Sequence, residues 1–324
     1  MKFLVILLAL AVNHYWTRDR DILNDTWFVR FQGWLAERTR ELPEQLTQHT
    51  LLYPALVLLL PTLLLSLVLW LVDGVAFGLV TLLVHIGVLL ALFDRVNVNA
   101  LTARYLELWR AENYEAAFLL LRERWHQVSL DNCDDRAMLH EEFCRFLMSS
   151  YFERLFAVVF WYLLLGPAGA LFYHLAFLYR SRIWQHADSA EGDLVMRLVY
   201  VLEWIPARLL ALTFSLAGDF VSAFTRLREI VLDMDRGAIS VVHTCALAAL
   251  GSSERVVLVR DTVTDDEEAD PVTTVLIDAE TAVDDHTLGV RAARQVEELL
   301  ALLNRSQIIW VSVLALLALY GIGG

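Results

Sequence analysis

Three charged side chains lie in a stretch of the chain that is otherwise apolar enough to enter a membrane. The sequence from 194 to 217, LVMRLVYVLEWIPARLLALTFSLA, carries Arg197, Glu203 and Arg208. A charge at the centre of a bilayer costs about 3 kcal/mol on insertion scales, so these groups must pair or must face protein or water. We expect Glu203 and Arg208 to pair across a kink at Pro206.

Buried acid and base groups of this kind can do chemistry. Burial raises the pKa of a Glu so that it can act as a general base, and an Arg can hold an anion. The candidate site comprises Glu203, Arg208, Trp204, Trp161, Tyr173, Glu142, Arg154 and Arg197. Two interpretations stay open, namely an enzyme or ligand site, and a buried Glu–Arg pair that fixes the register of two helices.

A second candidate is His85, near the middle of a separate apolar stretch. An ionisable group inside a membrane is a functional candidate, because it is costly to keep there. The alternative is a neutral His that forms a hydrogen bond with a neighbouring helix.

Composition excludes several kinds of site. The chain has 324 residues and a net charge of −13, which argues against a nucleic-acid partner. Lys2 is the only lysine, so a phosphate loop ending in Lys, a pyridoxal Schiff base and a kinase-type site are excluded. Cys133, Cys144 and Cys245 lack CxxC spacing; we expect free thiols, and neither a metal site nor a cofactor.

The elements that must position these residues are helices. The chain is 57% hydrophobic, against about 45–50% for a soluble domain. Apolar stretches near the spanning length of about 20 residues lie at 51–72, 75–93, 155–179, 194–217 and 307–322. A break at Gly166-Pro167 in the third stretch predicts central packing against other helices. The fold class is therefore all-α: a polytopic integral membrane bundle of about four to six membrane helices, with cytoplasmic helical segments.

The remaining segments are polar or too short to span. Residues 2–12 predict a half-embedded, uncleaved helix, with a signal peptide as the alternative. Residues 17–50 predict an amphipathic helix, and residues 100–128 a helix pair broken near Asn113. The chain thus divides into 1–50 (short apolar and amphipathic helices), 51–93 (membrane hairpin), 94–154 (cytoplasmic helices), 155–220 (core with membrane helices), 221–305 (cytoplasmic helices and acidic loop) and 306–324 (C-terminal membrane helix).

The distribution of arginine predicts which side each segment faces. Residues 13–50 and 94–154 are rich in Arg, whereas the Asp73-Gly74 turn carries none. The Arg-rich segments therefore face the cytoplasm and the turn faces outward. The third span then leads outward, and a return through 194–217 places the acidic segment 251–286 in the cytoplasm.

Several short motifs, taken together, resemble one family of membrane proteins. They are Phe160-Trp161-Tyr162, Gly166-Pro167-Ala168-Gly169-Ala170, Tyr173 and LEWIPARL at 202–209. This group resembles the shared core of AmpE and of the adenosylcobinamide-phosphate synthases (the CobD/CbiB group). The synthases carry Asn-Leu-Ser-Asp-Gly and Asn-Thr-Leu-Asp motifs where this chain has SYFERLF at 150–156 and AFLYR at 176–180. The chain is therefore similar to AmpE rather than to the enzymes.

The resemblance implies a multi-pass protein of the inner membrane of Gram-negative bacteria. It implies a regulatory signalling modulator that is linked to peptidoglycan recycling and to the β-lactamase induction behind antibiotic resistance. The absence of an internal lysine excludes conventional nucleotide-hydrolysis machinery, and the balance of the residues favours a protein that is not an enzyme, with the enzyme question left open. The alternatives are a membrane-embedded enzyme or small-molecule sensor derived from the synthase scaffold, and a subunit of a membrane assembly. The partners that we expect are the lipid bilayer, a protein bound through 251–286 and a small cell-wall-derived ligand; an oligomer stays open.

Overall fold

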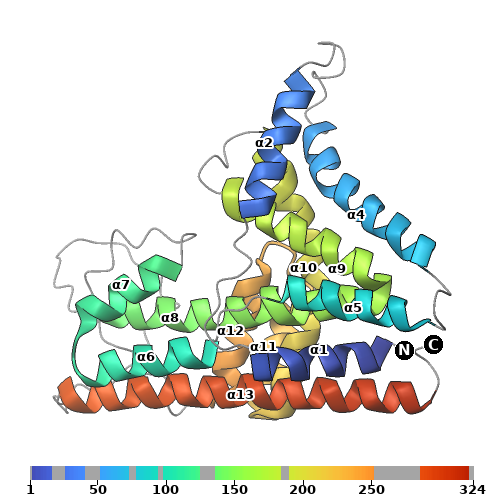
Figure 1. Ribbon diagram of the computed structural model, residues 1–324. Helices are drawn as coiled ribbons and strands as arrows, with labels where there is room; N and C mark the ends of the chain where they lie inside the picture. Colours follow the sequence, from blue (N-terminus) through green and yellow to red (C-terminus); the bar gives the residue numbers. More distant parts are fainter. Residues whose placement is uncertain are drawn as a thin grey trace.

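The computed structural model describes residues 2–16, 26–40, 52–72, 78–93, 98–124, 136–183, 190–251 and 285–320. These residues form α1 (Lys2–Trp16), α2 (Thr26–Arg40), α4 (Leu52–Val72), α5 (Leu79–Leu92), α6 (Val98–Arg110), α7 (Tyr114–Arg124), α8 (Arg136–Tyr151), the π-helix η3 (Phe152–Phe156), α9 (Ala157–Ile183), α10 (Ala190–Ala217), α11 (Phe220–Ile230), α12 (Ala238–Ala249) and α13 (Asp285–Leu319). The expected all-α membrane bundle is confirmed for the described ranges (Figure 1). The Asp73-Gly74 turn and nearly all of the acidic segment 251–286 lie outside them.

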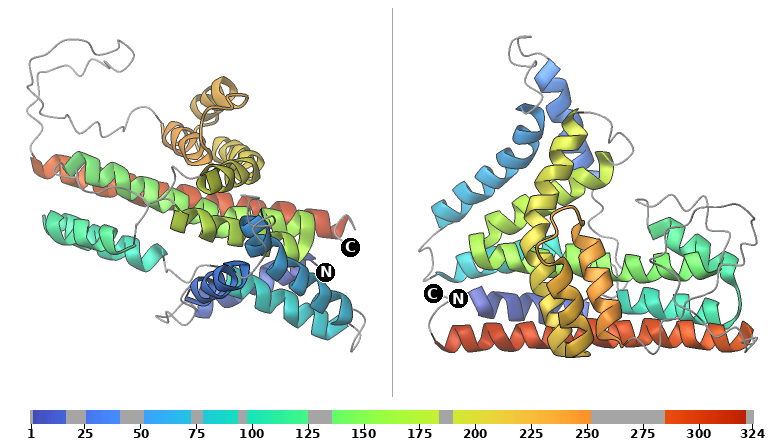
Figure 2. Two further views of the ribbon diagram at one scale, coloured as in Figure 1. Left: turned by 90° about the horizontal axis from the view of Figure 1, so that it is seen from above. Right: turned by 180° about the vertical axis from the view of Figure 1, so that it is seen from behind.

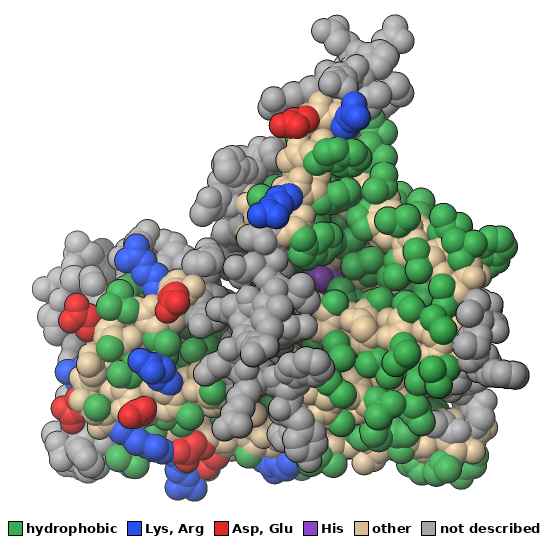
Figure 3. All heavy atoms as spheres, viewed as in Figure 1, with side chains coloured by type: hydrophobic (Ala, Val, Ile, Leu, Met, Phe, Trp, Pro, Cys, Tyr) green, Lys and Arg blue, Asp and Glu red, His purple; other side chains and the backbone are tan. Residues whose placement is uncertain are grey.

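One side of the molecule is apolar enough to face lipid. Within the described residues, three helical stretches are long and apolar enough to cross a membrane: Leu52–Val72, Met138–Ile183 and Gly289–Leu317. Apolar side chains cover the surface over α4 and α5, whereas charged side chains gather over α6 and α7 (Figure 3). On α4, Leu63, Leu64 and Trp70 are 60–74% exposed. Soluble monomers rarely expose large contiguous apolar patches, so this side has the composition of a lipid-facing surface.

The helix pair expected at residues 100–128 is confirmed. α6 ends at Arg110 and α7 begins at Tyr114. The Asn113 side chain accepts a hydrogen bond from the backbone N–H of Ala116 at 3.1 Å. This bond satisfies one of the free N–H groups at the start of α7, which is why the break falls at this residue.

The break expected at Gly166-Pro167 in the third apolar stretch is present, and it is a reversal: α9 changes direction at Gly166. Gly166 has φ 73° and ψ −163°, a region that essentially only glycine occupies. Arg180 forms an ion pair with Glu153, 27 residues earlier in the chain. A straight helix would separate these two residues by about 40 Å. The segment is therefore a helical hairpin whose second arm turns back at an angle to the first (Figure 1), so Arg180 reaches Glu153 at the start of the first arm.

Two glycines make this reversal feasible. Gly166 supplies the backbone conformation, and Pro167 has no N–H that the broken helix would leave unpaired. A Cβ atom at Gly169 would lie 2.3 Å from Cβ of Leu165 and 3.1 Å from the carbonyl oxygen of Trp161. Gly169 therefore lets the two arms approach closely at the apex of the hairpin.

α10 is arranged differently from the membrane helices around it. It crosses the long axis of α13 steeply rather than running beside it (Figures 1 and 2). α10 covers the stretch expected to form a fourth crossing, 194–217, but it is not among the three stretches that meet the requirements for a span. Its last turns pack against α11 and α12. α10 thus joins the hairpin to the α11–α12 pair.

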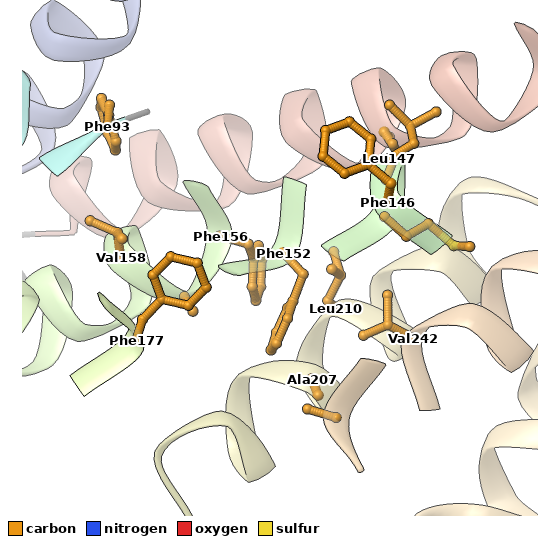
Figure 4. Packing of buried hydrophobic residues seen from close by; sticks show 14 of the residues in the cluster. Phe93, Phe146, Leu147, Phe152, Phe156, Val158, Phe177, Ala207, Leu210 and Val242 are labelled. Carbon is orange, nitrogen blue, oxygen red and sulfur yellow. The ribbon is translucent and has the colours of Figure 1, made fainter. Parts of the chain in front are cut away.

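The core lies where the hairpin, α10 and α12 meet. Figure 4 shows aromatic and aliphatic side chains from four elements pointing toward one another: Phe152, Phe156, Phe177, Ala207, Leu210 and Val242. All six are buried. α13 covers one side of this core with the buried residues Leu299, Leu302 and Leu303. It is one continuous helix across the boundary at 305/306 that the sequence predicted between a cytoplasmic segment and a membrane helix.

We predict that Gly166→Ala weakens the fold whereas Gly87→Ala does not. A side chain at Gly166 must adopt a φ near 73°, which costs about 1–3 kcal/mol in free energy of unfolding. Gly87 lies within α5, where a Cβ would meet nothing within 4 Å, so alanine is neutral or stabilises the helix by up to about 1 kcal/mol. Thermal unfolding of both variants in detergent measures the difference, and equal melting temperatures would contradict the hairpin geometry.

Candidate functional site

A largely buried arginine, whose side chain is 13% exposed, lies between two buried carboxylates. Nη1 of Arg180 donates to Oε2 of Glu203 at 3.0 Å, and Nη2 donates to Glu153. The hydroxyl of Tyr173 donates to Oε1 of Glu203 at 3.1 Å. Glu153 and Glu203 are each 2% exposed and Tyr173 is fully buried. We call these four residues the buried charge cluster.

The local structure explains how the four residues meet. Glu153 and Arg180 lie 13 and 14 residues from Gly166, so the hairpin brings them opposite each other. Tyr173 and Arg180 are seven residues apart on the second arm, two turns along one face of the helix. Glu153 lies in the π-helix η3, and single π turns occur frequently at functional sites.

The charges of the cluster do not balance. One guanidinium faces two carboxyl groups, so a net negative charge stays in the core when both are ionised. An uncompensated charge in a protein interior is strongly unfavourable. The cluster can therefore hold one proton between its carboxyl groups, an arrangement suited to proton transfer or to a two-state conformational change.

The expected pairing of Glu203 with Arg208 is wrong. Positions five apart on an α-helix point about 140° away from each other, so the two side chains leave α10 on different faces. Arg208 instead donates to the carbonyl oxygens of Val231 at 2.6 Å and Asp233 at 2.7 Å. Its guanidinium also lies 4.0 Å from the ring centroid of Trp204.

Arg208 fastens α10 to the end of α11. The carbonyls that it binds follow Ile230, the last residue of α11, where the helix dipole favours a cation. The turn is further held by Asp233, whose carboxylate accepts from the backbone N–H of Asp235 and from Nε of Arg236, both at 3.0 Å. These contacts, the backbone N–H of Asp235 first, hold the pKa of Asp233 below its usual value.

Two other candidate residues, Trp161 and Arg154, lie close to the elements that form the buried charge cluster. Trp161 donates from Nε1 to the carbonyl oxygen of Leu202 at 3.2 Å, which places it against α10 beside Glu203. The guanidinium of Arg154 lies 5.8 Å from the ring of Phe177 on the opposite hairpin arm.

Glu142 and Arg197 lie outside the cluster. Glu142 is on α8, where Oε1 lies 3.8 Å from Nη1 of Arg145. Arg197 is exposed on α10. His85 also has a structural contact: its Nδ1 lies 2.9 Å from the hydroxyl of Tyr162, which ties α5 to the first hairpin arm.

The sequence analysis missed Glu153 and Arg180 as site residues. Both are charged residues at the two ends of an apolar stretch that has Gly166-Pro167 at its middle. Their nearly equal spacing from Gly166, 13 and 14 residues, is the signal that predicts a contact once the break is understood as a reversal.

Two cavities are lined entirely by described residues, and neither includes a residue of the buried charge cluster. An apolar groove lies between α1, the first hairpin arm and α13, with Trp310 and Phe156 among its lining residues. A polar cavity of about 340 Å³ lies between the α6–α7 turn and the start of α13.

Comparison with known families gives one match. A family model described as "Regulatory signalling modulator protein AmpE" matches residues 21–277, more than half of the chain. The matched range includes the hairpin, the buried charge cluster and Arg208. Comparison with curated proteins and with solved structures gives no match.

We predict that removing the arginine of the cluster is far more harmful than neutralising one carboxylate. Arg180→Met leaves two buried carboxyl groups without their cation and lowers the free energy of unfolding by about 3–5 kcal/mol. Glu203→Gln keeps the size of the side chain and leaves a balanced Glu153–Arg180 pair, so the change is about 1 kcal/mol or less. Denaturation of both variants in mixed micelles measures this, and equal losses would contradict the charge imbalance.

Arg208 gives a separate prediction. Arg208→Ala removes charge-assisted, part-buried hydrogen bonds to two backbone carbonyl groups, which costs about 1.5–3 kcal/mol of stability. Arg197→Ala, an exposed arginine on the same helix, changes stability by about 0.5 kcal/mol or less. Limited proteolysis of the α11–α12 turn, which contains the carbonyl groups that Arg208 binds, should show faster cleavage only in Arg208→Ala. Unchanged cleavage there would exclude the fastening role.

Proposed function

Since the chain belongs to the AmpE family, we propose that it is a multi-pass regulatory signalling modulator of the inner membrane of Gram-negative bacteria. We propose further that it acts in peptidoglycan recycling and in the induction of β-lactamase. The family match over residues 21–277 supports this function, together with the apolar side over α4 and α5.

The observation that carries the mechanism is the attachment of α10 at two places. Through Glu203 it is bound to Arg180 of the membrane hairpin, and through Arg208 it is bound to the end of α11. A rearrangement of the hairpin must therefore move α10 and the α11–α12 pair with it. Switches of this type work through elements with two packed arrangements, which a ligand or a partner binds unequally.

The proposed partners follow from this arrangement. A protein that binds the acidic segment 251–286, which follows α12 in the sequence, would receive the output of the α11–α12 pair. A small cell-wall-derived ligand would supply the input, in the monomer or in an oligomer.

A second candidate function is a membrane-embedded enzyme or small-molecule sensor built on the synthase scaffold. The observation that favours it is the excess carboxyl group of the buried charge cluster, hydrogen-bonded to Tyr173. In this case Glu203 or Glu153 would transfer a proton to or from the substrate.

We predict that deleting the gene changes the level of β-lactamase induced by a sub-inhibitory β-lactam several-fold, and that the wild-type gene restores it. Unchanged induction in the deletion strain would contradict the proposed function. The complementing variants Arg208→Ala and Glu203→Gln separate the two candidates. In the signalling account, Arg208→Ala impairs induction because it uncouples α10 from α11. Glu203→Gln retains induction, because the amide oxygen of Gln can still accept the hydrogen bond from Arg180 that attaches α10 to the hairpin. In the enzyme account, Glu203→Gln abolishes the phenotype in a stable protein.

A further inference from the structure

The polar cavity in the charged part of the molecule has the features of a small-molecule site. It lies between the α6–α7 turn and the first turns of α13, among the charged side chains visible in Figure 3. Its volume of about 340 Å³ is in the range of small-ligand pockets. Its lining includes two aromatic residues, two arginines and two glutamates: Trp109, Tyr114, Arg110, Arg294, Glu112 and Glu297.

The two aromatic side chains of the cavity, Trp109 and Tyr114, are fixed by contacts with their neighbours. The rings of Trp109 and Tyr114 meet edge to face with their centroids 5.0 Å apart. Nε1 of Trp109 donates to the carbonyl oxygen of Gly289 at 3.2 Å, and the guanidinium of Arg136 lies 4.4 Å from the Tyr114 ring. A fixed aromatic surface of this kind binds the apolar part of a ligand with little loss of side-chain freedom.

The charged rim of the cavity can open. Nη2 of Arg110 donates to Oε1 of Glu297 across the gap between α6 and α13, and both side chains are at least half exposed. Exposed ion pairs contribute little to stability, because solvent screens them. A ligand that carries both charges can replace this pair at small cost. An anion alone would leave Glu297 without its cation, and a cation alone would leave Arg110 without its anion.

We propose that this cavity binds a small zwitterion, namely a free amino acid or a dipeptide. The ligand carboxylate is held by Arg110, the ammonium group by Glu297, and the ligand side chain lies against Trp109 and Tyr114. As the input of a signal, this site rests on the proposed signalling function; as a binding site, it stands without it.

The cavity is connected to the buried charge cluster by α13. This helix is continuous from Asp285 to Leu319. Beyond the cavity, its Trp310 lies edge to face against Phe156 of η3, with centroids 5.0 Å apart, and donates from Nε1 to Oγ1 of Thr213 on α10 at 2.9 Å. A ligand that shifts the start of α13 therefore acts on both elements that carry the glutamates of the cluster.

The test is ligand-induced stabilisation of the purified full-length protein in detergent, with free amino acids and unblocked dipeptides as probes. At least one probe should raise the melting temperature, and its N-acetylated and C-amidated forms should not. Arg110→Ala and Glu297→Ala should each weaken binding about tenfold or more. Arg145→Ala, which removes an exposed arginine paired with Glu141 on α8, should leave binding unchanged.

A steric variant completes the test. Gly289 lines the cavity and a Cβ there would meet nothing within 4 Å, so Gly289→Phe places a large side chain at the cavity wall, and Gly289→Ala is its matched control. We expect binding to be lost in the first and retained in the second. The proposal is overturned if no unblocked probe binds, if blocked probes bind equally, or if Gly289→Phe binds like the wild type. Binding without any β-lactamase phenotype in the deletion strain would refute the proposed function alone; the phenotype without binding would refute this site alone.

Discussion

Arg180 is the residue on which the arrangement of the other elements depends. A guanidinium presents several N–H donors in a fixed plane, so it can hold two carboxylates at once. Here it holds Glu153 of η3 and Glu203 of α10 while lying on the second arm of the hairpin itself. The three elements η3, α9 and α10 thus meet at the side chain of Arg180. Because a buried charge without its partner is strongly unfavourable, the hairpin must close fully for the core to form.

The hairpin and α10 together connect the apolar side of the protein to the α11–α12 pair. The apex of the hairpin exposes the apolar side chains of Leu164 and Leu165, and α10 carries the contact from Arg180 to the α11–α12 pair through Arg208. α13 adds a second connection, since Trp310 contacts both Phe156 and Thr213. A signalling protein needs a physical connection of this kind between its apolar part and its polar part.

The sequence predicts the helices well and their contacts less well. Apolar stretch length and the turn at Asn113 depend on local residues, so they can be predicted without knowledge of the fold. Gly166-Pro167 predicts a break, but the angle of the break depends on the contact between Glu153 and Arg180, which are 27 residues apart. The spacing of Glu203 and Arg208 argues against their pairing within one helix. The real partners are in other elements, where the sequence gives only the nearly symmetric spacing about Gly166.

The most direct test of the account is the distance between the two ends of the hairpin in the membrane. Spin labels at Arg145 on α8 and Arg182 at the end of α9, measured by pulsed electron paramagnetic resonance in lipid nanodiscs, report this distance. A continuous straight helix would separate the two positions by about 55 Å. The account predicts a distance below half of that value, because the second arm turns back toward the start of the first. A distance near the straight-helix value would contradict the reversal at Gly166, and with it the buried charge cluster.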